Sequence, residues 1–169
     1  MLIRTLTPDD LTAYCALRRE MLDDSPWAFT ASPEDDIGSD PLKLAARLKE
    51  PGQAIIAAFD DSGRIVGAAG LARNPKKKLS HRALVWGVYV TPSARGLGIA
   101  REVVTRTIDI ARTWPGVTSL ALAASERAQT AVRLYTSLGF KIWGTEPAAV
   151  QTGGQTYAEI HMVAFLDNP

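Results

Sequence analysis

Cysteine is nearly missing from this chain, since Cys15 is the single one among 169 residues. One thiol excludes an internal disulfide and a cysteine metal cluster, and it is typical of a protein from a reducing compartment. An excess of one charge is also missing: 19 basic residues stand against 18 acidic ones, for a formal net charge of +1. Because nucleic-acid-binding domains usually carry a strong basic excess, we expect no nucleic-acid partner.

Long apolar runs are lacking as well. No segment approaches the roughly 18–20 consecutive apolar residues that a membrane-spanning helix requires, and the first residues do not form the apolar core of a signal peptide. We therefore expect a cytoplasmic protein without a membrane partner. Histidine is scarce too: His81 and His161 are each alone in the sequence, so no metal site is expected.

What the chain does contain is ordinary for a globular protein, with 46% hydrophobic and 22% charged residues. The length fits one domain, residues 1–169, and no repeat or linker divides it. Apolar patterns of strand and helix period alternate along the chain and predict a mixed sheet with helices on its faces. The expected strands are 2–6, 54–59, 65–72, 83–90, 120–124, 142–143 and 156–166, and the expected helices are 8–22, 41–50, 99–114 and 128–138.

The most informative stretch is the junction Arg95-Gly96-Leu97-Gly98, which stands between an apolar strand and an amphipathic helix. Glycine allows positive φ angles and lets an anion approach the backbone, and the first N–H groups of a helix are unpaired. The helix macrodipole adds positive charge there, and Arg95 and Arg101 add guanidinium groups suited to phosphate oxygens. The junction therefore predicts a phosphate site; the alternative is a turn that only begins a helix.

Two common nucleotide motifs do not fit this junction. A P-loop needs a lysine after Gly98, and a dinucleotide fingerprint needs a small residue where Arg101 stands. Another motif, [Q/R]-x-x-G-x-[G/A], matches the run from Arg95 to Ala100, and A-x-x-L-Y-x-x-L-G-F matches residues 131–140. With both motifs in this order, the chain resembles the GCN5-related N-acetyltransferases, which use acetyl-CoA.

The resemblance extends from about Ile3 to Leu166 and implies a fold. That fold is the α/β GNAT (acyl-CoA N-acyltransferase) fold, with a mixed, mostly antiparallel sheet of six to seven strands and about four helices. The sheet is splayed between its fourth and fifth strands, and the pantetheine arm of the coenzyme lies in the gap.

The resemblance also implies which residues hold acetyl-CoA. N–H groups from about Gly96 to Arg101 would cradle the pyrophosphate, and the N–H of Val90 would polarise the thioester carbonyl, a form of oxyanion stabilisation. Relatives often carry asparagine where this chain has Ala128, so that contact is absent or comes from a neighbouring residue. The expected cofactor-binding residues are Val88, Tyr89, Val90, Arg95, Gly96, Leu97, Gly98, Ile99, Ala100, Arg101, Gln129 and Tyr135.

The same resemblance implies the catalytic groups. Tyr135 matches the tyrosine that protonates the departing thiolate; a phenol of pKa about 10 facing a thiol of pKa about 8.5 makes this transfer mildly uphill unless the site assists. The alternative is that Tyr135 is an ordinary core aromatic. Relatives often place a glutamate base on the strand that is here residues 83–88, which has no carboxylate. Glu159 is the best substitute, and a solvated glutamate on a strand face is its alternative.

The amine acceptor leaves a weaker trace in the sequence. Trp27, Phe29 and Trp86 are expected to line its pocket, with loops at 23–40 and 146–155 around them. The acids of the first loop, residues 34–36, would attract a cationic substrate or are simply solvated. The resemblance implies direct attack by a primary amine of a small molecule, a peptide or a protein N-terminus, and a possible homodimer. The alternative is a non-catalytic acyl-CoA-binding module that senses or regulates.

Overall fold

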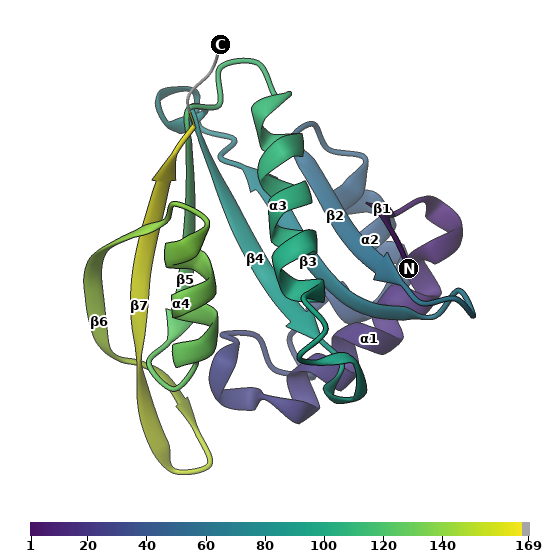
Figure 1. The fold of residues 1–169 in the computed structure, drawn as a ribbon, viewed down its shortest axis with the longest axis horizontal. Helices are drawn as coiled ribbons and strands as arrows, with labels where there is room; N and C mark the ends of the chain where they lie inside the picture. Colours follow the sequence, from purple (N-terminus) through teal and green to yellow (C-terminus); the bar gives the residue numbers. More distant parts are fainter. Residues whose placement is uncertain (167–169) are drawn as a thin grey trace.

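A seven-stranded mixed sheet forms the framework of this computed structural model, which describes residues 1–166 (Figure 1). Its strand order is β1-β2-β3-β4-β5-β7-β6, and β4 with β5 is the parallel pair among antiparallel neighbours. The strands are β1 (Leu2–Thr5), β2 (Gln53–Phe59), β3 (Ile65–Arg73), β4 (Arg82–Val90), β5 (Ser119–Ser125), β6 (Lys141–Thr152) and β7 (Gln155–Phe165). The mixed, mostly antiparallel sheet expected from the sequence is confirmed.

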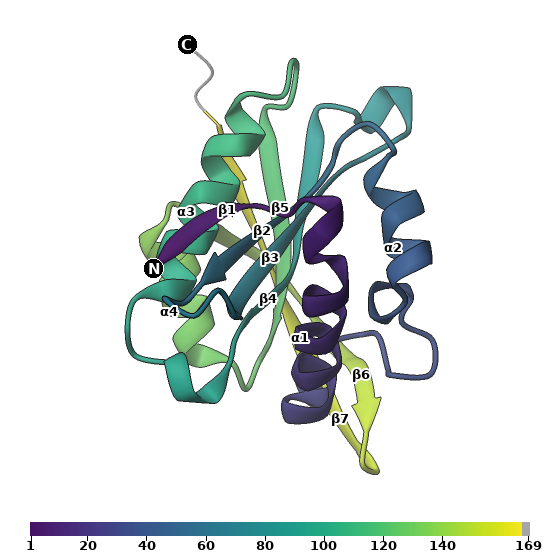
Figure 2. The same ribbon diagram turned by 90° about the vertical axis from the view of Figure 1, so that its right-hand side faces the viewer.

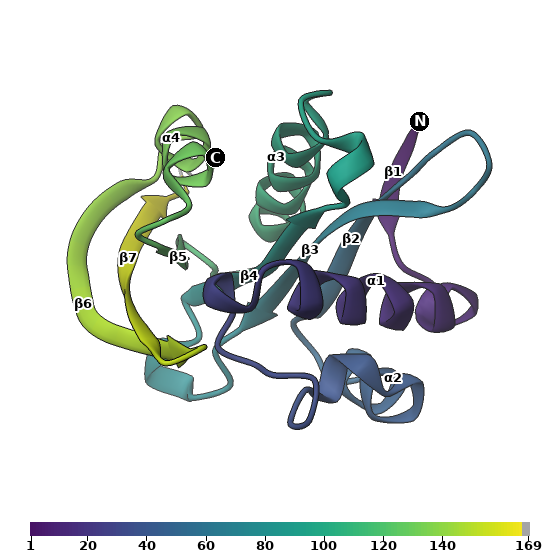
Figure 3. The same ribbon diagram turned by 90° about the horizontal axis from the view of Figure 1, so that it is seen from below.

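Four α-helices cover the sheet: α1 (Leu11–Asp24), α2 (Pro41–Leu48), α3 (Ile99–Arg112) and α4 (Gln129–Ser137). The helices α3 and α4 lie on one face and α1 and α2 on the other, as Figure 2 shows from the side. In Figure 3, α1 and α2 lie on the side of β2–β4 and away from β6. Within residues 1–166 no helix is both long and apolar enough to cross a membrane.

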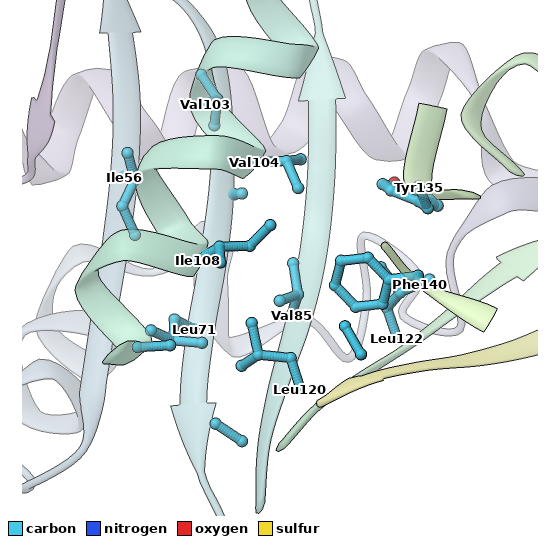
Figure 4. Close-up of a cluster of buried hydrophobic side chains, with 14 of the residues drawn as sticks. Ile56, Leu71, Val85, Val103, Val104, Ile108, Leu120, Leu122, Tyr135 and Phe140 are labelled. Atoms are coloured by element: carbon cyan, nitrogen blue, oxygen red, sulfur yellow. The ribbon is translucent and has the colours of Figure 1, made fainter. Parts of the chain in front are cut away.

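The apolar core occupies both faces of the sheet. On the α3 side, buried residues of α3 recur at the three- and four-residue spacing that keeps them on one side of a helix. Figure 4 shows the side chains that meet there: Ile56, Leu71 and Val85 from the sheet, Val103, Val104 and Ile108 from α3, and Leu120, Leu122, Tyr135 and Phe140 toward α4. On the other face, α1 and α2 bury a second cluster that includes Tyr14, Met21 and Leu44.

The sheet opens between β4 and β5. These strands pair only from Arg82 with Ser119 to Leu84 with Ala121, and beyond this point they diverge (Figure 1). A bulge bends β4 just after the pairing ends, because Gly87 has a φ of 57° and the register with β3 shifts there. The splay expected between the fourth and fifth strands is confirmed.

Two expected elements differ from the structure. The strand expected at 142–143 runs through Lys141–Thr152, so the loop expected at 146–155 is mostly a β-hairpin that turns at Gly153 and Gly154. Register shifts in β6, together with the positive φ of Ala148, interrupt the period-two pattern that would have indicated a long strand. The first helix begins later than expected because Pro8–Asp10 form a 3-10 turn.

A close approach at Gly70 gives the first prediction. A Cβ atom at this position would lie 2.0 Å from Cε2 of Trp86, so the indole packs directly on the glycine backbone. Gly70→Ala is expected to displace the Trp86 ring and to lower the free energy of unfolding by about 1–3 kcal/mol, measured by urea denaturation. Gly144→Ala, where a Cβ would meet nothing within 4 Å, is the matched control and should change stability by less than about 0.5 kcal/mol.

Candidate active site

A cleft of about 710 Å³ opens where β4 and β5 diverge. Its walls are the end of β4, the start of α3, α4 and the 3-10 turn Pro26–Ala28. The expected cofactor-binding residues that line it are Val88, Tyr89, Val90, Arg95, Gly96, Gly98, Ile99, Ala100, Arg101 and Tyr135. Two expected residues lie outside the lining: Leu97 is 70% exposed, and the Gln129 amide donates to the Glu126 carbonyl (2.8 Å).

The glycine junction has an open main chain. Gly96 and Gly98 both have a φ of 80°, and a Cβ at either position would meet nothing within 4 Å. Glycine is therefore favoured here by backbone conformation rather than by crowding. Among the described residues, the N–H groups of Gly96, Leu97 and Gly98 donate no hydrogen bond, and the first turn of α3 adds further unpaired donors. The junction thus presents several free donors to the cleft.

The arginines of the junction differ in their contacts. Arg95 is held by a carboxylate of α1, since its Nη2 lies 2.5 Å from Oδ2 of Asp24 and its Nε donates to the Val90 carbonyl (3.0 Å). The hydrogen bond from Arg95 lowers the pKa of Asp24. Arg101 instead donates to Oγ of Ser137 and joins α3 to α4 across the cleft (2.9 Å). Arg95 therefore braces the end of β4, while Arg101 lines the cleft and pairs with no carboxylate among residues 1–166.

Sequence reasoning missed two further cations of the cleft. Arg127 and Arg133, which flank the start of α4, both line it, and within residues 1–166 neither forms an ion pair with a carboxylate. Arg133 lies within the second motif at a position that the motif leaves free, so no pattern singled it out. Together with Arg101, these residues make the cleft suitable for an anionic ligand.

The backbone of Val90 faces the gap in the sheet. The N–H of Thr91 donates to the Val66 carbonyl in β3 (2.9 Å), and the hydrogen-bonding direction alternates from one residue of a strand to the next. The N–H and C=O of Val90 therefore point away from β3, toward the side where β5 has diverged. The contact of its carbonyl with Arg95 lies on that side as well.

Tyr135 lies on α4 with its ring buried and 6% of its surface exposed at the cleft wall. The ring packs edge-on against Phe140, with centroids 6.1 Å apart. Burial raises the pKa of the Tyr135 phenol, so the hydroxyl stays protonated at neutral pH. A buried, protonated phenol beside the cleft is in the state that a proton donor requires.

Glu159 belongs to a cluster that the sequence did not reveal. On β7 it pairs with Ser125 of β5 on one side and Glu146 of β6 on the other. The His161 Nε2 lies 3.1 Å from Oε2 of Glu146. One carboxylate oxygen from each of Glu146 and Glu159 and one ring nitrogen of His161 lie within 4.8 Å of one another. His161, which looked isolated in the sequence, is therefore part of a polar group on the α1 side of the sheet.

The ionisation of Glu159 follows from these neighbours. Burial raises its pKa, the His161 ring lowers it, and the nearby Glu146 raises it. The net pKa is above the ordinary value for a glutamate. If the β4–β5 register is continued beyond Leu84, Ser125 falls roughly opposite Val88. Glu159 is paired with Ser125, so it lies at about the same height along the strands, across the gap from Val88.

The aromatic residues expected in the acceptor pocket lie near arginine side chains. The Trp27 ring lies 5.1 Å from the guanidinium carbon of Arg127, and the rings of Phe29 and Trp86 each lie 5.7 Å from that of Arg18. Trp27 and Phe29 line the cleft, whereas Trp86 lies outside its lining. The three side chains therefore do not form a single wall.

An acid expected to be solvated or to attract substrate is instead a structural group. Asp36 binds Arg18 through two hydrogen bonds (3.0 and 3.1 Å), and both side chains are less than a tenth exposed. Burial disfavours the charged form of Asp36, but hydrogen bonds from Arg18 and Ser39 outweigh that cost and lower its pKa. The expectation for the loop acids is wrong for Asp36, which anchors the loop to α1.

The family model described as "Acetyltransferase (GNAT) family" matches residues 15–140, well over half of the chain. The chain belongs to the acetyltransferase (GNAT) family. The family expected from the two sequence motifs is thereby confirmed. An uncharacterised N-acetyltransferase of Mycobacterium tuberculosis is 34% identical to this GNAT chain over 103 residues, which are 61% of this chain and 62% of the relative. The match thus spans less than two thirds of that relative.

Solved structures agree with the GNAT fold. The ribosomal-protein-alanine N-acetyltransferase of Brucella melitensis superposes with a TM-score of 0.86 at 24% identity, covering 98% of this chain and all (100%) of the other. A phosphinothricin acetyltransferase of Sinorhizobium meliloti, solved in complex with AcCoA, gives a TM-score of 0.78 at 18% identity, covering 98% and 88% of the two chains. At such identities the likeness establishes the fold.

Proposed function

We propose that this protein transfers an acetyl group from acetyl-CoA to a primary amine. The observation that carries the proposal is the single cleft lined by Gly96 and Gly98 at the open junction, by Val90 at the end of β4 and by Tyr135 on α4. Its volume lies within the range of pockets that hold cofactors, and its free N–H donors and arginines suit a pyrophosphate. When bound, acetyl-CoA supplies an activated acetyl thioester.

Three parts of this cleft have definite tasks in the proposed reaction. Free N–H groups at Gly96–Arg101 hold the pyrophosphate, and the divergence of β4 and β5 leaves room for the pantetheine arm. The N–H of Val90 donates to the acyl oxygen and stabilises the negative charge that develops there. Tyr135 donates its phenolic proton to the sulfur as the amine forms the new amide bond. Burial raises the pKa of this phenol, so the proton stays on Tyr135 until negative charge develops on the sulfur.

Glu159 accepts the proton that the attacking amine loses, directly or through water. It lies across the gap from the end of β4, on the face that carries Trp86. Glu146 and His161 lie beside it and are hydrogen-bonded to each other, and the exposed Glu146 offers the proton a path toward solvent. The position of this cluster favours Glu159 over the acidic loop, because Asp36 is already paired with Arg18.

An amine panel separates this function from the alternative of a non-catalytic acyl-CoA-binding module. Purified protein is mixed with acetyl-CoA and each amine, and free thiol is followed with a thiol reagent. Amine-dependent thiol release is the expected result. Binding of acetyl-CoA with no release over the whole panel would contradict the enzyme and support the sensor.

The proposed base predicts a pH-dependent loss. Deprotonation of an α-amine of pKa near 8 costs about 1.4 kcal/mol at pH 7. A base is therefore expected to raise the rate about tenfold at pH 7 and hardly at all above pH 9. Glu159→Gln is expected to lower kcat/KM about tenfold at pH 7 and to match wild type at high pH. The rate of wild type should fall as acidification protonates Glu159, at a pH above the usual glutamate pKa.

Neither Glu159 nor Glu34 lines the cleft. The matched control is therefore Glu34→Gln, which neutralises an exposed glutamate of the 23–40 loop that is not part of the group formed by Glu146, Glu159 and His161. Its pH profile should follow that of wild type. A Glu159→Gln profile identical to wild type at every pH would remove Glu159 from the mechanism and leave deprotonation of the amine to solvent.

A further inference from the structure

A second cavity, of about 790 Å³, lies on the α2 side of the sheet. It sits where β4 and β5 are still paired, and α2, the end of β3 and the start of β4 form its walls. Leu84 and Ala121, paired across the two strands, provide an apolar floor, and Leu84 is 47% exposed. None of the residues assigned above to the proposed reaction lines this cavity.

Cations outnumber acids among the charged residues of the lining. They are Lys43, Arg47, Arg73 and Arg82, against one lining carboxylate, Glu50. Lys43 has Asp40 at 3.8 Å, but within residues 1–166 no carboxylate forms an ion pair with any of the three arginines. Arg73 donates to the Ser80 carbonyl (2.7 Å), a contact that leaves its charge uncompensated.

Elsewhere within residues 1–166, ion pairs between arginine and a carboxylate are common. Arginines outside the two cavities mostly bind a carboxylate, as Arg4, Arg18, Arg64 and Arg112 do. Apart from Arg19 and Arg106, every arginine without a carboxylate partner lines one of the two cavities. Like charges on one surface repel one another, so such a cluster is stabilised by a bound anion. In the first cavity that anion is the proposed coenzyme.

We propose that the second cavity binds an oxyanion group, a carboxylate or a phosphate, carried by the amine acceptor. This inference rests on the proposed acetyl transfer. The cavity and the cleft are lined by neighbouring stretches of β4, with the Trp86 ring between them. This ring lies 5.1 Å from the Arg47 guanidinium carbon and 5.7 Å from the Arg18 guanidinium carbon. Arg18 lies beside Phe29, which lines the cleft.

The distance along β4 between the second cavity and the cleft sets the length of the acceptor. Leu84 in the cavity and Val88 in the cleft are four residues apart on β4, or about 13 Å at the rise of a strand. The acceptor therefore carries its oxyanion about 13 Å from the amine that is acetylated. An extended peptide covers this distance in about four residues, with a free N-terminus at one end and an acid at the other.

The test compares acceptors that differ only in the anion. Tetra-alanine with a free carboxylate is compared with its C-terminal amide, and an aminoalkyl phosphate of the same length with the matching amino alcohol. The anionic member of at least one pair is expected to have a KM lower by about tenfold or more. A lower KM in the peptide pair identifies a carboxylate as the source of the oxyanion, and in the other pair a phosphate.

Arg82→Gln should remove this preference, because Arg82 lines the cavity at the start of β4 and forms no ion pair with a carboxylate of residues 1–166. We expect it to raise KM for the anionic acceptor about tenfold and to leave that of the neutral partner unchanged. Arg106→Gln removes the same charge from an exposed position of α3 outside both cavities and should change neither KM. Equal KM values within both pairs for wild type would overturn the inference.

A binding measurement separates failure of this inference from failure of the proposed function. Calorimetric titration of tetra-alanine and of the aminoalkyl phosphate without acetyl-CoA is expected to show binding that Arg82→Gln weakens and Arg106→Gln does not. If no amine is ever acetylated, the acetyl transfer fails, while this titration still decides whether the cavity holds an oxyanion. Titration curves that are the same for all three proteins would refute the site.

Discussion

Replacing Tyr135 by phenylalanine is expected to slow acetyl transfer by about 10²-fold, a typical effect of removing a general acid. The variant keeps the ring that packs against Phe140 and loses only the hydroxyl. Without that proton, the thiolate must leave as an anion in a desolvated cleft, which raises the barrier of the step. The affinity for coenzyme A should stay nearly unchanged, because the proposed pyrophosphate donors are main-chain N–H groups of another segment. Thiol release measures the rate, and calorimetry measures the affinity.

Tyr157→Phe is the control for Tyr135→Phe. The Tyr157 hydroxyl donates to the Gln155 side chain on the β6–β7 hairpin (2.7 Å), and the residue does not line the cleft. Its loss should leave the rate within about twofold of wild type. An unchanged rate for Tyr135→Phe would mean that the tyrosine is an ordinary core aromatic, the alternative that the sequence leaves open.

Arg18→Leu is expected to produce the largest loss of stability, about 3–5 kcal/mol in the free energy of unfolding. The substitution leaves the Asp36 carboxylate buried without its cation, with 6% of that side chain exposed. It also removes the guanidinium group beside Phe29 and Trp86. Urea denaturation followed by tryptophan fluorescence measures the change.

Two comparisons identify the cause of that loss. Asp36→Asn added to Arg18→Leu should restore part of the stability, because the unpaired charge is gone. Arg112→Leu breaks an exposed pair on α3, with side chains 51% and 45% exposed, and should cost less than about 1 kcal/mol. If the double variant is no more stable than Arg18→Leu, loss of packing rather than the buried charge explains the effect.

The same ion pair sets a pH dependence. The pKa of Asp36 is lower in the folded protein than in the unfolded chain, so below pH 4 the unfolded state binds the proton more readily. The stabilisation is therefore present above about pH 4 and is lost as the pH falls through the lowered pKa. In Arg18→Leu this contribution is absent, so its stability should decline less steeply with acidification below pH 4.

Local pattern in the sequence was enough to predict the family and the mixed sheet, and to single out the glycine junction before α3. The spacing of apolar residues gave most strands and helices within a few residues, and the two motifs correctly indicated the family. Gly96 and Gly98 were interpretable because positive φ angles and open backbone are properties of a single short segment. Such features need no knowledge of what lies across the fold.

Tertiary structure alone decided which distant side chains meet. The sheet register brings Glu146 to Glu159 and His161, the α1–α2 loop folds back to bury Asp36 against Arg18, and the splay of β4 opens the cleft. Three arginines without a carboxylate partner in residues 1–166 gather in a second cavity from three separate elements, α2, β3 and β4. Sequence pattern records the preferences of neighbouring residues, whereas these contacts depend on register, bulges and chain crossings that join residues far apart in the chain.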